Sequence, residues 1–192
     1  MTEPLSFQVE RDPSVDQQSE HPVAFASPDF DVSPFQTLDT SGKELVAKSP
    51  NYVRLDLQNL ECFEIVDQQY EQMGVTFTNA IALSPSNPAF PAVQGQTVLL
   101  GAPKSGWLEA TFTQPVQFVG SLVTSSRRTV LMGFDDENQL VAKAETSGPN
   151  LAGSNSPTPP NAELNLVAQN IRRITFSSLG GQLALGEFSF GV

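Results

Sequence analysis

Short runs in which apolar and polar residues alternate make up most of this chain from about residue 53 to the C-terminus. In the clearest run, 107–112, the apolar residues Leu108, Ala110 and Phe112 alternate with polar ones. A period of two is typical of a strand buried on one face, and the Gly, Pro, Asn and Asp residues between runs are typical of turns. We therefore predict an all-β fold, an antiparallel jelly-roll-like β-sandwich.

The remaining runs place the other strands of this sandwich. Residues 67–73 are polar and compact, so we expect one helical turn there, ended by Gly74 as a C-terminal cap. The residues before them, Phe63 and Ile65, alternate with Glu64 and predict an apolar strand face. The other predicted strands lie at 53–57, 75–77, 97–100, 107–112, 116–124, 129–134, 139–144, 164–166, 173–177 and 183–190.

The sequence also predicts two local features of the sandwich, a hairpin and a β-bulge. The strands at 129–134 and 139–144 predict a hairpin, because the four residues between them suit a turn. The last strand changes parity, since Leu183 and Leu185 are odd-numbered whereas Phe188 and Phe190 are even-numbered. An extra residue at Gly186 turns both pairs inward, so we predict a β-bulge there.

Residues 1–50 differ from the sandwich, which we place at 51–192. They carry nine acidic and three basic residues, and their apolar residues are sparse and aperiodic. Such a segment buries too little apolar surface to offset the entropy of ordering, so we predict an extended, largely disordered arm. Phe25, Phe30 and Phe35 recur every five residues, and the alternative to a loose tail is a strap that docks these rings on its own sandwich or on another subunit.

Charge and rare residues exclude several chemistries. The net charge of −11 disfavours nucleic acid and anionic membranes as partners, and no apolar stretch reaches the ~20 residues of a membrane helix. The only histidine, His21, lies in the arm, which disfavours nucleophilic triads. The only cysteine, Cys62, has acidic neighbours and is expected to be a buried spectator. We therefore predict no enzymatic activity.

Three stretches resemble a family. Residues 67–77, with Tyr70 followed by Gly-Val-Thr-Phe, are similar to the opening of a jelly-roll domain found in exported bacterial proteins. Residues 131–141 are similar to its central hairpin, and 174–176 with 186–190 are similar to its closing strands. Related sandwiches include galactose-binding-like and carbohydrate-binding modules. The resemblance covers about 60–192 and implies a sandwich that binds a glycan. Gly186-Glu187 replaces the paired acids of the family's closing strand, which weakens an inherited calcium site.

Carboxylates and one tryptophan are the candidate site residues. Hard oxygen ligands suit calcium, so the candidate calcium ligands are Asp135, Asp136, Glu137 and Glu187; the alternative is a solvated hairpin tip. No other cofactor is expected. By alternation Trp107 shares the polar face with Glu109, where it either stacks on a sugar or is covered by packing.

These observations leave three functions open. The main prediction is a non-catalytic structural or assembly module whose arm docks on another subunit or on a second copy. The alternative is a carbohydrate-binding module, with or without calcium, and the minor alternative is a glycoside hydrolase using two carboxylates. The first residues lack the basic and apolar regions of a secretory signal, so the sequence as written is expected in the cytoplasm, although the resembled family is largely exported.

Overall fold

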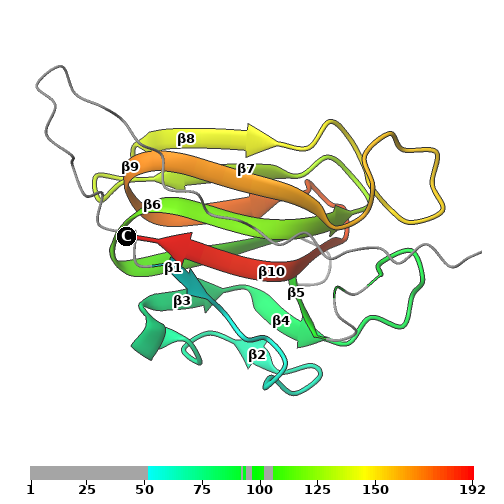
Figure 1. The fold of residues 1–192 in the computed structure, drawn as a ribbon, viewed down its shortest axis with the longest axis horizontal. Coiled ribbons are helices and arrows are strands. Elements are labelled where there is room, and N and C mark those ends of the chain that lie inside the picture. The colour runs from blue at the N-terminus through cyan, green and yellow to red at the C-terminus, as the bar shows by residue number, and fades with distance from the viewer. Residues whose placement is uncertain (1–51, 92, 94–96, 102–105) are drawn as a thin grey trace, which may run out of the picture. The chain divides into compact units, whose positions relative to one another are not determined.

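The structure is a computed structural model that describes residues 52–91, 93, 97–101 and 106–192 (Figure 1). The predicted arm 1–50, with Phe25, Phe30, Phe35 and His21, lies outside the described residues. The described part forms ten strands and a short 3-10 helix, η1 (Glu71–Met73). The strands are β1 (Tyr52–Arg54), β2 (Ile65–Val66), β3 (Val75–Thr78), β4 (Ala80–Leu83), β5 (Val98–Gly101), β6 (Trp107–Ser125), β7 (Val130–Phe134), β8 (Leu140–Glu145), β9 (Ala162–Ser177) and β10 (Leu183–Gly191). No helix in this part is long and apolar enough to cross a membrane.

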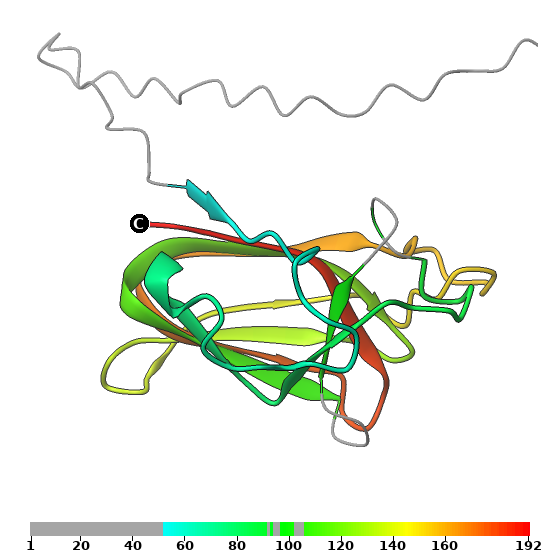
Figure 2. The same cartoon turned by 90° about the horizontal axis from the view of Figure 1, so that it is seen from below.

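All pairings are antiparallel, and the sheet folds over into two layers. Its order is β2-β4-β5-β10-β6-β9-β7-β8, with β1 also paired to β10 and β3 to β6. The first half of β6 and the second half of β9 lie in one layer with β3, β7 and β8. Their other halves lie in the second layer with β10. Figure 2 shows β6 curving from one layer into the other. The predicted all-β sandwich is confirmed.

The core lies between the layers and is built from alternate residues of the long strands. In β6, Leu108, Ala110 and Phe112 are buried as the alternation predicts, and Val119 and Val123 continue this face in the second half. Phe188 of β10 packs edge-on against Phe77 with ring centroids 5.1 Å apart. Burying such rings is the main driving force for the fold, at about 25 cal/mol per Å² of apolar surface.

The predicted bulge in the last strand is confirmed. The register of β10 against β6 shifts between Leu185 and Phe188, so the two residues Gly186 and Glu187 oppose the single residue Leu122 of β6. Both pairs named in the prediction are then buried, with Leu183, Leu185, Phe188 and Phe190 at exposed fractions between 0% and 2%. The helical turn before β3 is also confirmed, because Gly74 caps η1 with φ of 97° and donates its N–H to the carbonyl of Glu71.

The predicted hairpin is formed by β7 and β8. Its central residues Val130, Met132 and Phe134 share a face, and that face is the half-exposed one, while Leu131 between them is fully buried. Two pairs of predicted strands are single strands instead: 107–112 and 116–124 form β6, and 164–166 and 173–177 form β9. The reason is that β6 bends through register shifts near Val116 and continues, where the pattern suggested a turn.

Two predictions were wrong near β2. Phe63 and Ile65 are 75% and 70% exposed, and the buried residue there is Val66. A turn changes the parity, since the N–H of Glu64 bonds the carbonyl of Glu61 and Phe63 has a φ of 70°. Cys62, expected to be buried, is exposed in the same turn.

Candidate functional site

The outward side of the second layer carries a row of aromatic residues beside a row of polar ones. We call this side the β10 face; its residues are Tyr52, Arg54, Phe118, Gly120, Leu122, Asn165, Gly186, Glu187 and Ser189. The register aligns one row across four strands, consisting of Tyr52, Gly191, Phe118 and Val167. The next row consists of Arg54, Ser189, Gly120 and Asn165. Aromatic and hydrogen-bonding groups therefore lie in adjacent rows of one face.

The two rings of the aromatic row lie close together, with Tyr52 exposed and Phe118 half-buried. The rings of Tyr52 and Phe118 lie 6.1 Å apart at an interplanar angle of 33°, and Tyr52 is 59% exposed. Gly120 lets Phe118 and Asn165 approach the sheet, because a Cβ added at Gly120 comes within 2.8 Å of Cζ of Phe118 and within 2.6 Å of Oδ1 of Asn165. The small residue at Gly120 thus sets the position of both side chains.

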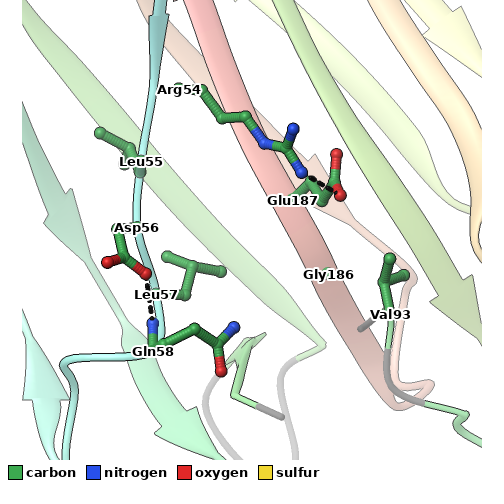
Figure 3. Close-up of a pocket in the computed structure, with 8 residues that line it drawn as sticks. All are labelled: Arg54, Leu55, Asp56, Leu57, Gln58, Val93, Gly186 and Glu187. Atoms are coloured by element: carbon green, nitrogen blue, oxygen red, sulfur yellow. Dashed lines mark hydrogen bonds and ion pairs between the residues drawn. The ribbon is translucent and has the colours of Figure 1, made fainter. Parts of the chain in front are cut away.

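A hollow of about 300 Å³ continues the polar row toward β5 (Figure 3). We call it the β10 hollow; its lining residues are Arg54, Leu55, Asp56, Leu57, Gln58, Val93, Gly186 and Glu187. The bulge creates it, since the extra residue brings Gly186 and Glu187 to the surface together. Glycine also keeps it open, because a Cβ at Gly186 comes within 3.1 Å of Cγ2 of Val93.

The wall of the hollow opposite Val93 is held by three hydrogen bonds. Tyr70, 7% exposed, donates its hydroxyl to the carbonyl of Asp56 at 2.7 Å, and burial raises the pKa of Tyr70 to about 12. The carboxylate of Asp56 accepts the N–H of Gln58 at 2.9 Å, and the amide oxygen of Gln58 accepts the N–H of Thr97 at 3.3 Å. These bonds fix the wall before any ligand binds, which lowers the entropy cost of binding.

The charged groups of the hollow are Arg54, Asp56 and Glu187. Figure 3 shows the guanidinium of Arg54 turned toward the carboxylate of Glu187, with which it forms an ion pair. Their side chains are 52% and 30% exposed, so both keep donors and acceptors open to solvent. One arginine against two carboxylates gives the hollow a net charge of −1, and an anionic ligand is disfavoured there.

Trp107 and Glu109, the residues predicted to bind a ligand, lie on the outward side of the other layer. We call this side the β7 face; its residues are Trp107, Glu109, Thr111, Met132, Phe134, Arg173, Thr175 and Ser177. Trp107 is 37% exposed and stands at one end, next to Ser177. Glu109 accepts a hydrogen bond from Arg173 at 2.8 Å, and the guanidinium carbon of Arg173 lies 4.2 Å from the centre of the Phe134 ring.

The structure separates the predicted calcium ligands. Asp135 accepts the N–H groups of Glu137 and Gln139, which closes the hairpin tip, and Asp136 accepts the side-chain N–H of Asn170. Glu187 instead pairs with Arg54. Within the described residues no three acidic, His or Cys side chains are grouped to hold a metal ion. Calcium binding stays a prediction.

Sequence reasoning missed Tyr52, Arg54, Phe118 and Asn165. Arg54 and Glu187 are 133 positions apart, and alternation says which face a residue occupies but not which strands are neighbours. Phe118 was missed for a further reason. The sequence predicts a separate strand that begins at Val116, in which Phe118 shares a face with Val116, whereas the register shifts near Val116 turn Phe118 outward. Two signals in the sequence pointed to this site: the parity break at Gly186, and Glu187 as a candidate calcium ligand.

Comparison with known proteins finds weak similarity to solved structures. No family model and no curated protein matches the chain. Among solved structures, a DUF4465 family protein from Bacteroides caccae is 9% identical over 74% of this chain and 100% of its own, with a TM-score of 0.45. A family 29 carbohydrate-binding module from Piromyces equi is 8% identical over 61% of this chain and 90% of its own, with a TM-score of 0.35.

The low-affinity xylan-binding module CBM86 from Roseburia intestinalis is 12% identical over 60% of this chain and 93% of its own, with a TM-score of 0.32. The strand pairing of the described residues is that of an all-β sandwich, and these solved structures, two of them carbohydrate-binding modules, are weakly similar to it. Identities and TM-scores this low do not carry a ligand from those proteins to this chain.

Proposed function

We propose that this chain is a non-catalytic binding module that holds a neutral glycan on the β10 face. The observation that carries the proposal is the ring pair of the exposed Tyr52 and the half-buried Phe118, in the row next to Arg54 and Asn165. A sugar ring has an apolar C–H side and a rim of hydroxyls. Aromatic side chains suit the first, and charged or amide groups that both donate and accept suit the second.

Charge and shape support a neutral ligand. The β10 hollow has a net charge of −1 within a chain of −11, so uronate or sulfate groups are repelled. Its volume of about 300 Å³ lies at the lower end of ligand sites, and the aromatic row extends it across the sheet. Both lining carboxylates, of Asp56 and Glu187, are engaged with protein donors, which favours binding over proton transfer to a ligand.

The test is thermal unfolding with a panel of neutral polysaccharides, each with calcium and with chelator. A glycan at about 100 times its Kd adds roughly 2.7 kcal/mol to the free energy of unfolding. The double variant Tyr52→Ala, Phe118→Ala loses this shift, whereas the matched control Trp107→Ala, on the β7 face, keeps it. Absence of a shift with every glycan, or equal shifts in the double variant and the wild type, contradicts the proposal.

Assembly is a second candidate function, and the observation favouring it is the pair Phe63 and Ile65, exposed on and beside β2. β2 lies at the end of the described sheet order, and it can pair with β2 of a second copy once the side chain of Gln69, which donates to the carbonyl of Ile65 at 2.8 Å, moves aside. Light scattering tests this: the wild type is a dimer and the variant Phe63→Ser, Ile65→Ser is a monomer. A monomeric wild type rules it out.

A further inference from the structure

A second hollow, of about 500 Å³, opens where β6 ends and β7 begins. We call it the arginine hollow; its lining residues are Ser126, Arg127, Arg128, Val130, Pro149, Ser178 and Leu179. No carboxylate is among these residues. In a chain whose net charge is −11, a hollow lined by two adjacent arginines is a local exception to the surrounding charge.

The two arginines differ in what already binds them. Arg128 forms an ion pair with Glu145 at 3.3 Å. The carboxylate of Glu145 also forms an ion pair with Lys143 at 2.9 Å. These two cations hold the pKa of Glu145 below its usual value, so the carboxylate is ionised at neutral pH. Arg127 is exposed, and its guanidinium has no ion pair or hydrogen bond with any residue that the structure describes. Its N–H donors are therefore open to a ligand.

The stem of Arg127 is held in place although its head is free. A Cβ added at Gly181 comes within 3.0 Å of Cγ of Arg127 and within 3.0 Å of Oγ of Ser126, so both side chains pack against this glycine. The hydroxyl oxygen of Ser126 accepts the N–H of Gln182 at 2.8 Å, which leaves its own O–H to donate. A stem fixed by packing loses less rotamer entropy when its guanidinium binds.

The arginine hollow also has apolar lining residues, and one of them, Leu179, has a strained backbone. Leu179 is 76% exposed with a φ of 39°, in the left-handed region that leucine rarely adopts. A residue held there costs of order 1 kcal/mol or more, and such residues gather at functional sites. Leu179 presents its side chain to the hollow together with Val130 and Pro149, so apolar carbon and two guanidinium groups line the same space.

We propose that the arginine hollow binds an organic carboxylate. The guanidinium of Arg127 takes the carboxylate oxygens through paired N–H donors, and Arg128 adds a second positive charge. The carbon chain of the ligand lies against Leu179, Val130 and Pro149, which removes their exposed apolar surface from water. This chemistry differs from that of the β10 face, so the proposed carboxylate site does not depend on whether the β10 face binds a glycan.

The test is a calorimetric titration of the full chain with acetate, hexanoate and inorganic sulfate at low ionic strength. Hexanoate binds about tenfold or more tighter than acetate, because its extra methylenes reach the apolar wall. The variant Arg127→Gln, Arg128→Gln binds hexanoate at least about tenfold more weakly. The control Arg172→Gln, whose guanidinium donates to the carbonyl of Thr113 at 2.8 Å, leaves hexanoate binding unchanged.

A second variant separates the apolar contact from the charge. Leu179→Gly folds normally, because glycine accepts a positive φ, and it binds acetate as the wild type does but loses the advantage of hexanoate. The proposal is overturned if the wild type shows no saturable binding of any of the three anions. It is also overturned if sulfate binds as tightly as hexanoate, or if the double arginine variant binds hexanoate like the wild type.

Discussion

The β10 face and the β7 face use the same kinds of residues and leave very different chemistry exposed. Each has an Arg–Glu ion pair and two aromatic side chains. On the β7 face the pair of Arg173 and Glu109 is 26% and 23% exposed, and Arg173 also covers the ring of Phe134 and bonds Asn138. On the β10 face the pair of Arg54 and Glu187 is 52% and 30% exposed.

The difference comes from the backbone beneath the side chains. The β7 face lies on a region where β6 and β9 pair in continuous register from Trp107 to Thr111, so the side chains stand close together and bind one another. The β10 face lies beside a bulge and carries glycines at 120 and 186, and the glycine at 186 leaves space for the hollow. The ion pair of the β10 face is the more exposed of the two, so its remaining donors and acceptors are open to a ligand.

The largest expected effect is that of filling the β10 face. Gly120→Leu places a side chain where Phe118 and Asn165 lie, so glycan affinity falls more than about tenfold, or ~1.4 kcal/mol. The matched control is Thr111→Leu, exposed on the same strand but on the β7 face, and it leaves affinity unchanged. Affinity electrophoresis or calorimetry checks both. If both variants lose the same glycan affinity, the glycan does not bind specifically to the β10 face, and the proposed difference between the two faces is wrong.

The two ion pairs provide the next comparison. Arg173→Ala lowers the free energy of unfolding by about 1–2 kcal/mol, because it removes a cation–π contact and leaves Glu109 half-buried without its partner. Arg54→Ala costs less than about 1 kcal/mol, as expected for an exposed pair, but it weakens glycan binding. Urea unfolding measures both costs. If Arg54→Ala lowers the free energy of unfolding more than Arg173→Ala does, the stabilising role assigned to the Arg173–Glu109 pair is wrong.

The buried hydroxyl of Tyr70 gives the β10 face a dependence on high pH. The pKa of Tyr70 is raised from 10.0 to about 12 in the folded protein, so folding favours the protonated phenol. Its contribution is complete below pH 10 and is lost as the pH rises through about 12. Tyr70→Phe therefore costs about 1 kcal/mol at neutral pH, and this deficit disappears between pH 10 and 12. Denaturant unfolding of the wild type and the variant between pH 10 and 12 measures this difference in the free energy of unfolding. A difference that does not change with pH shows that the ionisation of Tyr70 is not coupled to folding.

The smallest effects are expected for single hydroxyls. Thr175 on the β7 face has a buried hydroxyl without a partner among the described residues, whereas Ser189 on the β10 face donates to the carbonyl of Gly120 at 3.3 Å. Thr175→Val raises the free energy of unfolding by up to about 1 kcal/mol, while Ser189→Ala lowers it by about 0.5–1 kcal/mol. Calorimetric melting distinguishes the signs. A destabilised Thr175→Val indicates a bonding partner for that hydroxyl.

The sequence by itself determined the fold class, the buried face of most strands and the bulge. These features depend on local periodicity: Leu185 and Phe188 cannot both reach the core of a regular strand, whichever strands lie beside it. Phe63 and Ile65 show the limit of this reasoning, since one turn reversed their parity and put both into solvent.

Only the tertiary structure decided which groups form the sites. Glu187 was visible in the sequence as one acid among several, but its partner Arg54 comes from a strand 133 positions away, and the aromatic row joins β1 to β6. Pairing of distant strands is set by the packing of the whole core, which the alternation within one strand does not encode. For that reason the sequence predicted a sandwich, whereas the positions of its two hollows and of the aromatic row are known only from the folded structure.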